Sequence, residues 1–168
     1  VDAGYKYIIV LGGLNKNLRS QTQIALEENF SGLKTPTRKD STTGPVGVGN
    51  IPVDTDKNLD VTVFTSRADN GDFKKSDVTR SQSMSINEDQ PKLFIVKKNV
   101  SPLKYLLQYL FTKLKDEDGI NEPLLLIDDE CDNGSVNTKD RDKDPTRFNA
   151  YIRAILSLFN RSAYVAYT

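Results

Sequence analysis

The stretch that decides the fold is Leu124-Leu125-Leu126-Ile127-Asp128-Asp129-Glu130-Cys131-Asp132. Four consecutive aliphatic residues are too few for a helix of useful length, and they are typical of a strand that is buried on both faces of a parallel sheet. The acidic residues follow at the carboxyl end of this strand, which is where open α/β sheets bind their ligands. The stretch therefore predicts an α/β fold with a candidate site at residues 128–132.

Two interpretations of these acids stay open at this point. Carboxylates on a rigid strand end can hold magnesium and can orient a water molecule for attack on a phosphate. Aspartate is also a common turn former and helix cap, so the same residues fit a purely structural strand end. The rest of the chain has to decide between a catalytic and a structural role.

Composition limits the class of protein. The 168 residues fit one domain with a substantial core, while 37% hydrophobic and 27% charged residues predict that some segments are polar loops. Lys plus Arg and Asp plus Glu both number 23, so any binding of nucleic acid would need a local cluster of basic groups. With no signal peptide, no long apolar run and the single Cys131, we expect a cytoplasmic protein without a membrane segment.

The residue types exclude several kinds of catalytic site. The chain contains no histidine, which rules out Ser-His-Asp and Cys-His nucleophile systems and His-based nuclease metal sites within it. One cysteine is too few for a structural zinc site. Asp72-Phe73-Lys74 could mimic the end of a restriction-type nuclease motif, but no matching Pro-Asp precedes it, so a structural role is favoured.

The hydrophobic pattern predicts alternating strands and helices. We expect strands at 5–11, 59–65, 91–97, 124–127 and 163–168, and helices at about 15–29, 101–115 and 145–159. Residues 33–58 predict a loop or insertion, and residues 66–89 a polar segment. Gly44 to Gly49 lacks the Lys-Ser/Thr of a phosphate-binding P-loop. The order of elements predicts a three-layer α/β fold with a mainly parallel sheet in a single domain, 1–168.

Polar and basic residues stand where two of these strands end. Arg19, Gln21 and Thr22 fall on the early turns of the first predicted helix, which we expect to be exposed, and Lys98 and Asn99 follow the strand at 91–97. Such groups could pair with nucleic-acid phosphates or donate hydrogen bonds to the backbone. For the helix taken alone, an ordinary solvated face is the simpler interpretation.

Several runs in the chain carry a family resemblance. Asp129-Glu130-Cys131-Asp132 is similar to the DExD or Walker B motif (motif II) of superfamily 2 helicases. As a whole the chain resembles the Z-one domain family of bacterial and phage proteins, which pair a helicase-like ATPase core with restriction-type endonuclease functions. The runs that carry this resemblance are 17–22 (NLRSQT), 44–49 (GPVGVG), 96–100 (VKKNV), 123–132 (PLLLIDDECD), 144–147 (DPTR) and 161–168 (RSAYVAYT).

The resemblance implies roles for the acidic residues. It implies a fold related to part of the first RecA-like lobe of superfamily 2 helicases, in which Asp129 is the magnesium carboxylate and Glu130 the base that activates water. Asp132 would couple this site to the next motif, which Tyr167 and Thr168 would begin. Asp128 would be an additional acid at the strand end, with no role assigned.

The resemblance also implies a partner and a cofactor. The segment with Arg19, Gln21 and Thr22 corresponds to motif Ia, which contacts the backbone of nucleic acid, with DNA as the first expectation. Magnesium and ATP are implied for the full-length protein. Because no P-loop precedes Tyr5 and no second lobe follows Thr168, we expect a fragment that is inactive alone and holds no cofactor by itself.

Three functions remain after the sequence is read. The first is a lobe of a nucleic-acid-dependent ATPase in a restriction or phage-defence enzyme. The second is a nuclease domain proper, which is disfavoured because the sequence shows no separate two-metal or histidine-based site. The third is a non-enzymatic domain that binds nucleic acid or protein and carries a degenerate acidic cluster.

Overall fold

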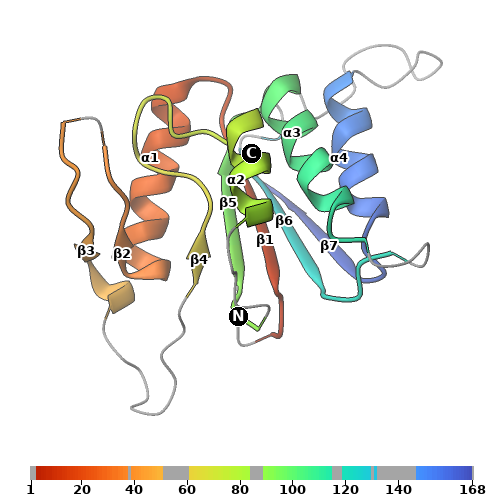
Figure 1. Cartoon of the computed structure of the whole chain (residues 1–168), viewed down its shortest axis with the longest axis horizontal. Helices are drawn as coiled ribbons and strands as arrows, with labels where there is room; N and C mark the ends of the chain where they lie inside the picture. The colour runs from red at the N-terminus through yellow and green to blue at the C-terminus, as the bar shows by residue number, and fades with distance from the viewer. Residues whose placement is uncertain are drawn as a thin grey trace.

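A five-stranded parallel sheet forms the centre of the molecule (Figure 1). The structure is a computed structural model that describes residues 3–37, 39–50, 61–83, 89–114, 119–129, 131 and 147–167. The strand order is β4-β5-β1-β6-β7, and every neighbouring pair runs parallel. The strands are β1 (Tyr7–Gly12), β4 (Thr62–Val63), β5 (Lys92–Val96), β6 (Leu124–Asp129) and β7 (Ser162–Ala166). The prediction of a mainly parallel α/β fold is therefore confirmed.

Helices cover both faces of the sheet and give the fold three layers (Figure 1). On one face, Ile8 and Val10 of β1 pack in a cluster with Leu26 and Phe30, which belong to α1 (Lys16–Leu26) and to the π-helical turn η1 (Glu27–Ser31). The other face is covered by α2 (Lys75–Ser83), α3 (Val100–Phe111) and α4 (Arg147–Ser157). Successive residues of a strand point to opposite faces, so the uninterrupted apolar run of β1 fills both cores.

The first helix begins where the sequence predicts and ends differently. The side chain of Asn15 accepts hydrogen bonds from the backbone N–H groups of Asn17 and Leu18, at 3.0 and 2.9 Å, which caps the helix. The α-helical part ends at Leu26, and the chain continues as η1 until Gly32, whose φ of +65° is readily adopted by glycine.

Two segments for which the sequence predicts no helix or strand contain regular structure. The polar segment 66–89 includes α2, whose sequence Lys-Ser-Asp-Val-Thr-Arg-Ser-Gln-Ser has one apolar residue and therefore no helical periodicity to detect. The segment 33–58 contains a short antiparallel pair, β2 (Leu33–Lys34) and β3 (Gly44–Pro45), and the 3-10 turn η2 (Val48–Asn50). Residues 51–58 of this segment lie outside the described residues.

The glycine run 44–49 packs against η1. A Cβ atom added at Gly47 would lie 2.3 Å from the backbone oxygen of Glu28, and one added at Gly49 would lie 2.7 Å from the backbone nitrogen of Gly32. These glycines allow two backbones to approach closely. This packing explains the run without a phosphate-binding role.

No helix among the described residues combines the length and the apolar character needed to cross a membrane.

Candidate active site

The candidate site lies where β1 and β6 end side by side. In the sheet register Leu11 is paired with Asp128, and Gly12 with Asp129. From β1 the chain passes through α1 towards β4 at one edge of the sheet, and from β6 it passes through α4 to β7 at the other edge. A crevice between strands whose connections leave in opposite directions is the usual ligand position in open α/β sheets.

The two aspartates at the end of β6 have opposite environments. Asp128 is fully buried, and it continues the buried row of Leu124 and Leu126. Asp129, the next residue of the strand, points to the other face and is exposed. Of these two carboxylates, only Asp129 is accessible to a ligand in solution.

Asp128 is held by two side chains from neighbouring elements. Nζ of Lys98 lies 2.5 Å from Oδ1 of Asp128, and the hydroxyl of Tyr164 donates a hydrogen bond to Oδ2 at 2.7 Å. Burial raises the pKa of Tyr164, and the hydrogen bond to the carboxylate of Asp128 raises it further, so the phenol remains a donor at neutral pH. Asp128, to which the motif assigns no role, is therefore engaged in an internal contact.

The remaining acids of the motif cannot be placed. Glu130, predicted as the base, and Asp132, predicted to couple the site to the next motif, lie outside the described residues. In the part of the chain that the structure does describe, no three His, Cys, Asp or Glu side chains gather closely enough to hold a metal ion. An exposed carboxylate is a suitable oxygen ligand for magnesium, so Asp129 fits the implied ion as a single ligand.

Two of the five residues predicted to contact nucleic acid are buried. The prediction that Arg19 is exposed is wrong, because its side chain is fully buried. Lys98 is also buried and is paired with Asp128. Both cationic groups are bonded to groups inside the protein, so neither side chain is accessible to a phosphate in this conformation.

The other three predicted contacts lie in the middle of α1 and at the N-cap of α3. Gln21 is exposed and Thr22 is half-buried, with its hydroxyl donating to the backbone oxygen of Leu18 at 3.1 Å. Asn99 is exposed and caps α3 by accepting from Ser101 N at 3.2 Å. The two helix starts are tied together, because the backbone N–H of Lys98 donates to the oxygen of Gly13 at 2.9 Å.

The buried Arg19 is part of a polar network along α1 that was not predicted from the sequence. Its two terminal nitrogens donate to the backbone oxygens of Ser66 at 2.9 Å and Ala68 at 2.7 Å. One and two helical turns further on, Gln23 and Glu27 are also fully buried. We call the set Arg19, Gln23, Glu27, Thr35, Thr65 and Arg67 the α1 polar network.

The α1 polar network holds the segment after β4 against the helix. Gln23 accepts from the hydroxyl of Thr65 at 2.8 Å and donates to Glu27 at 3.0 Å. Glu27 accepts from Nε of Arg67 at 2.7 Å and from the hydroxyl of Thr35. The spacing of Arg19, Gln23 and Glu27 at intervals of four residues was the available signal, because it places all three on one helix face.

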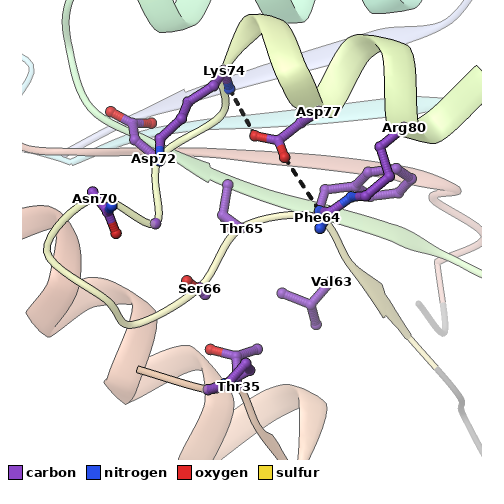
Figure 2. A pocket seen from close by; sticks show the side chains of 12 residues that line it. Thr35, Val63, Phe64, Thr65, Ser66, Asn70, Asp72, Lys74, Asp77 and Arg80 are labelled. Atoms are coloured by element: carbon purple, nitrogen blue, oxygen red, sulfur yellow. Dashed lines mark hydrogen bonds and ion pairs between the residues drawn. The ribbon is translucent and has the colours of Figure 1, made fainter. Parts of the chain in front are cut away.

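A polar pocket of about 320 Å³ lies beside β4 (Figure 2). Thr35 stands on one side, and Asp77 and Arg80 of α2 on the other, with Val63 between them. Asp77 accepts from the backbone N–H of Lys74 at 2.9 Å and pairs with Arg80 at 3.2 Å. Of the acidic motif, the described residues Asp128 and Asp129 do not line the pocket, which is therefore separate from the exposed carboxylate of Asp129.

Asp72, the acid of the nuclease-like triplet, has a structural role in this region. It accepts backbone hydrogen bonds from Phe73 at 2.9 Å and Lys97 at 3.2 Å. Burial raises the pKa of Asp72, and these two N–H groups partly oppose that shift.

Comparison of the chain with family models, curated proteins and solved structures gives no match. The resemblance to the Z-one domain family therefore rests on the sequence motifs and stays a prediction.

Proposed function

We propose that this chain supplies the Walker B part of a nucleic-acid-dependent ATPase of restriction or phage-defence type, with Asp129 as its magnesium carboxylate. The observation that carries the proposal is the exposure of Asp129 at the carboxyl end of β6, beside the end of β1. Bound magnesium would neutralise charge on the phosphates of ATP. The sheet contributes a rigid position for the ligand, as such chemistry requires.

Further roles in the proposal follow the motif. Glu130 would orient and deprotonate the attacking water, and Asp132 would couple the site to the next motif. Gln21 and Asn99 are the exposed side chains that could touch nucleic acid, with DNA as the expected partner. Arg19 and Lys98 are left out of this contact because both are buried. The proposed location is the cytoplasm.

A second candidate is a non-enzymatic domain that binds nucleic acid or protein. The internal use of Arg19 and Lys98 favours this candidate with a protein as the partner, since neither cation is then free to bind the phosphates of a nucleotide or a nucleic acid. In that case the acids of residues 128–132 form a structural strand end.

Two measurements separate these functions. The coding sequence on either side of the chain is read first, and a Gly-x-x-x-x-Gly-Lys-Ser/Thr segment upstream is expected for an ATPase. ATP hydrolysis by the complete gene product is then measured with magnesium and DNA. Glu130→Gln should lower kcat by at least about 100-fold while ATP binding is kept. Glu122→Gln, which changes an acid before β6, is the control and should leave kcat unchanged.

Absence of the upstream segment, together with no magnesium-dependent hydrolysis, would refute the ATPase proposal and leave the interaction domain. Hydrolysis that is equally fast in wild type and in Glu130→Gln would remove the catalytic role of Glu130.

A further inference from the structure

The buried row of β6 contains a charge where the pattern of the strand calls for an aliphatic residue. Leu124 and Leu126 are fully buried in the core beneath α3 and α4, and Asp128 follows them on the same face with no exposed area. Burying a carboxylate carries a large desolvation cost unless a partner compensates it. Local rules of this kind are usually broken where a protein needs a particular geometry.

The compensating charge comes from Lys98, which lies two residues beyond Val96, the residue of β5 that is level with Asp128. Phe94 and Val96 are fully buried, and Lys98 continues their row just beyond the strand. Since β1 lies between β5 and β6, the contact between Lys98 and Asp128 crosses the end of β1. There β1 continues with Gly12 and Gly13, which contribute no side chains between the two partners.

The strand on the other side of β6 contributes a third partner. Tyr164 of β7 donates its hydroxyl to Asp128. The backbone of the same strand end adds two bonds, because Tyr167 N donates to the backbone oxygen of Asp128 at 2.9 Å and Cys131 N donates to the oxygen of Tyr167 at 2.7 Å. Contacts from β5 and from β7 thus converge on the residue that precedes Asp129.

We propose that Lys98, Asp128 and Tyr164 form a positioning cluster that fixes the carboxyl end of β6 and thereby the carboxylate of Asp129. Stability alone does not account for the cluster, because well-packed hydrophobic residues commonly replace a buried ion pair without loss of stability. The ion pair and the hydroxyl instead fix the orientation of the strand end, because each contact forms only within a narrow range of distances and angles. The inference rests on the proposed function for the role of Asp129 as a magnesium ligand. The contacts that hold Asp128 do not depend on it.

The test replaces the ion pair by apolar residues of similar size. In the double variant Lys98→Met with Asp128→Leu, no unpaired charge remains buried, so the chain should fold with an unchanged urea midpoint. Two readouts then report on the strand end: hydrogen exchange of the Asp129 amide, and paramagnetic broadening of its NMR signal by Mn²⁺ as a probe for magnesium. The matched control, Lys16→Met with Asp69→Leu, removes an exposed ion pair of the same residue types.

The double variant is expected to speed exchange at Asp129 by at least about tenfold and to weaken Mn²⁺ binding by about 10–100-fold. The control variant should change neither readout. If both readouts match wild type in a folded double variant, the positioning role is overturned while the proposed ATPase stands.

A second variant keeps the test decisive if the double variant fails to fold. Tyr164→Phe removes only a hydroxyl from a side chain that is 43% exposed. It should still weaken Mn²⁺ binding and speed exchange at Asp129, and an unchanged Asp129 in this variant would overturn the inference. If Mn²⁺ leaves Asp129 unaffected even in the wild-type chain, which is expected to hold no cofactor by itself, the exchange rates alone decide the positioning role. The metal site of the proposed function is then tested by hydrolysis in the complete gene product.

Discussion

The two faces of the sheet are covered by helices that bury different chemistry. On α3 the buried residues are Pro102, Leu103, Leu106, Tyr109 and Leu110, all of which pack through carbon-rich surfaces. On α1 the buried residues are Arg19 and Gln23, followed by Glu27 at the start of η1. The α3 side follows the ordinary rule that helices bury apolar faces, and the α1 side does not.

This difference indicates what each side does. Apolar burial is non-directional, so the buried face of α3 supplies stability without fixing the position of any one group. The α1 polar network is directional, because each of its groups needs a partner at a particular place. Those partners are Thr35 and residues 65–68, which follow β4. Thr35, Thr65 and Ser66 line the polar pocket. The buried face of α1 therefore shapes a surface as well as stabilising the fold, whereas the buried face of α3 contributes stability alone.

The largest effect is expected from Glu27→Leu, which breaks the α1 polar network. Removing the carboxylate leaves Arg67 and the hydroxyl of Thr35 without their acceptor in a buried setting. The free energy of unfolding should fall by about 3–5 kcal/mol, as measured by urea denaturation. Glu28→Leu, at the neighbouring half-buried position, is the control. A loss in Glu27→Leu no larger than in the control would show that the network is not needed for stability.

On the apolar side, Leu106→Ala should lower the free energy of unfolding by about 3 kcal/mol. The leucine is fully buried, and its truncation leaves a cavity below α3. Phe111→Ala at the end of the same helix, where the ring is 54% exposed, should cost much less. Hydrogen exchange distinguishes the two sides, since Leu106→Ala should leave the amides of residues 65–68 protected while Glu27→Leu should expose them. Equally fast exchange of the amides of residues 65–68 in both variants would show that the two sides do not differ in this way.

A smaller and equal effect is expected from the helix caps of the two sides. Asn15 caps α1 and Asn99 caps α3, so Asn15→Ala and Asn99→Ala should each cost about 1 kcal/mol in urea denaturation. Because a cap affects only its own helix end, equal losses would show that the two sides differ in their buried faces and not in their helix starts. A markedly larger loss for one cap would mean that the helix starts also differ.

The smallest effect is a change in the pH dependence of stability from Asp72→Asn. Because burial raises the pKa of Asp72 in the folded state, the unfolded chain loses this proton first as the pH rises from the ordinary value of 3.8. Between pH 3.8 and the pKa of Asp72 in the folded state, the folded chain binds more protons than the unfolded chain. The free energy of unfolding therefore falls with rising pH over this range and levels off above the folded-state pKa. The asparagine keeps an oxygen for the N–H groups of Phe73 and Lys97, and its stability should vary less across this pH range.

Urea midpoints measured at several pH values from about 4 upward check this prediction. An identical slope in wild type and Asp72→Asn would contradict it.

The parallel sheet was predictable because its strands have strong local signals. The runs 7–11, 92–96 and 124–127 are aliphatic or aromatic over most of their length, and each is followed by a helix with apolar spacing or by turn residues. The helix α2 was not predictable, since only Val78 interrupts its polar sequence and contacts the core. Its place is set by tertiary packing, which local patterns do not report.

The candidate site was predictable only in part. The position of the acids at the end of β6 followed from the strand pattern, and the period of two explains why Asp128 and Asp129 diverge. The burial of Arg19 and Lys98 did not follow, because a long cationic side chain is usually exposed and its partners lie far away in sequence. Ser66 and Ala68 are 47 and 49 residues from Arg19, and no spacing rule links them.

The outer edge of β7 has a practical consequence for anyone who handles the protein. Tyr164 and Val165 of this strand are 43% and 37% exposed, and among the described strands only β6 pairs with it. A bare, apolar strand edge is a template on which other chains add strands and form aggregates. Concentrated samples should therefore scatter more light over time, and Val165→Lys is the single change most suited to keeping them clear.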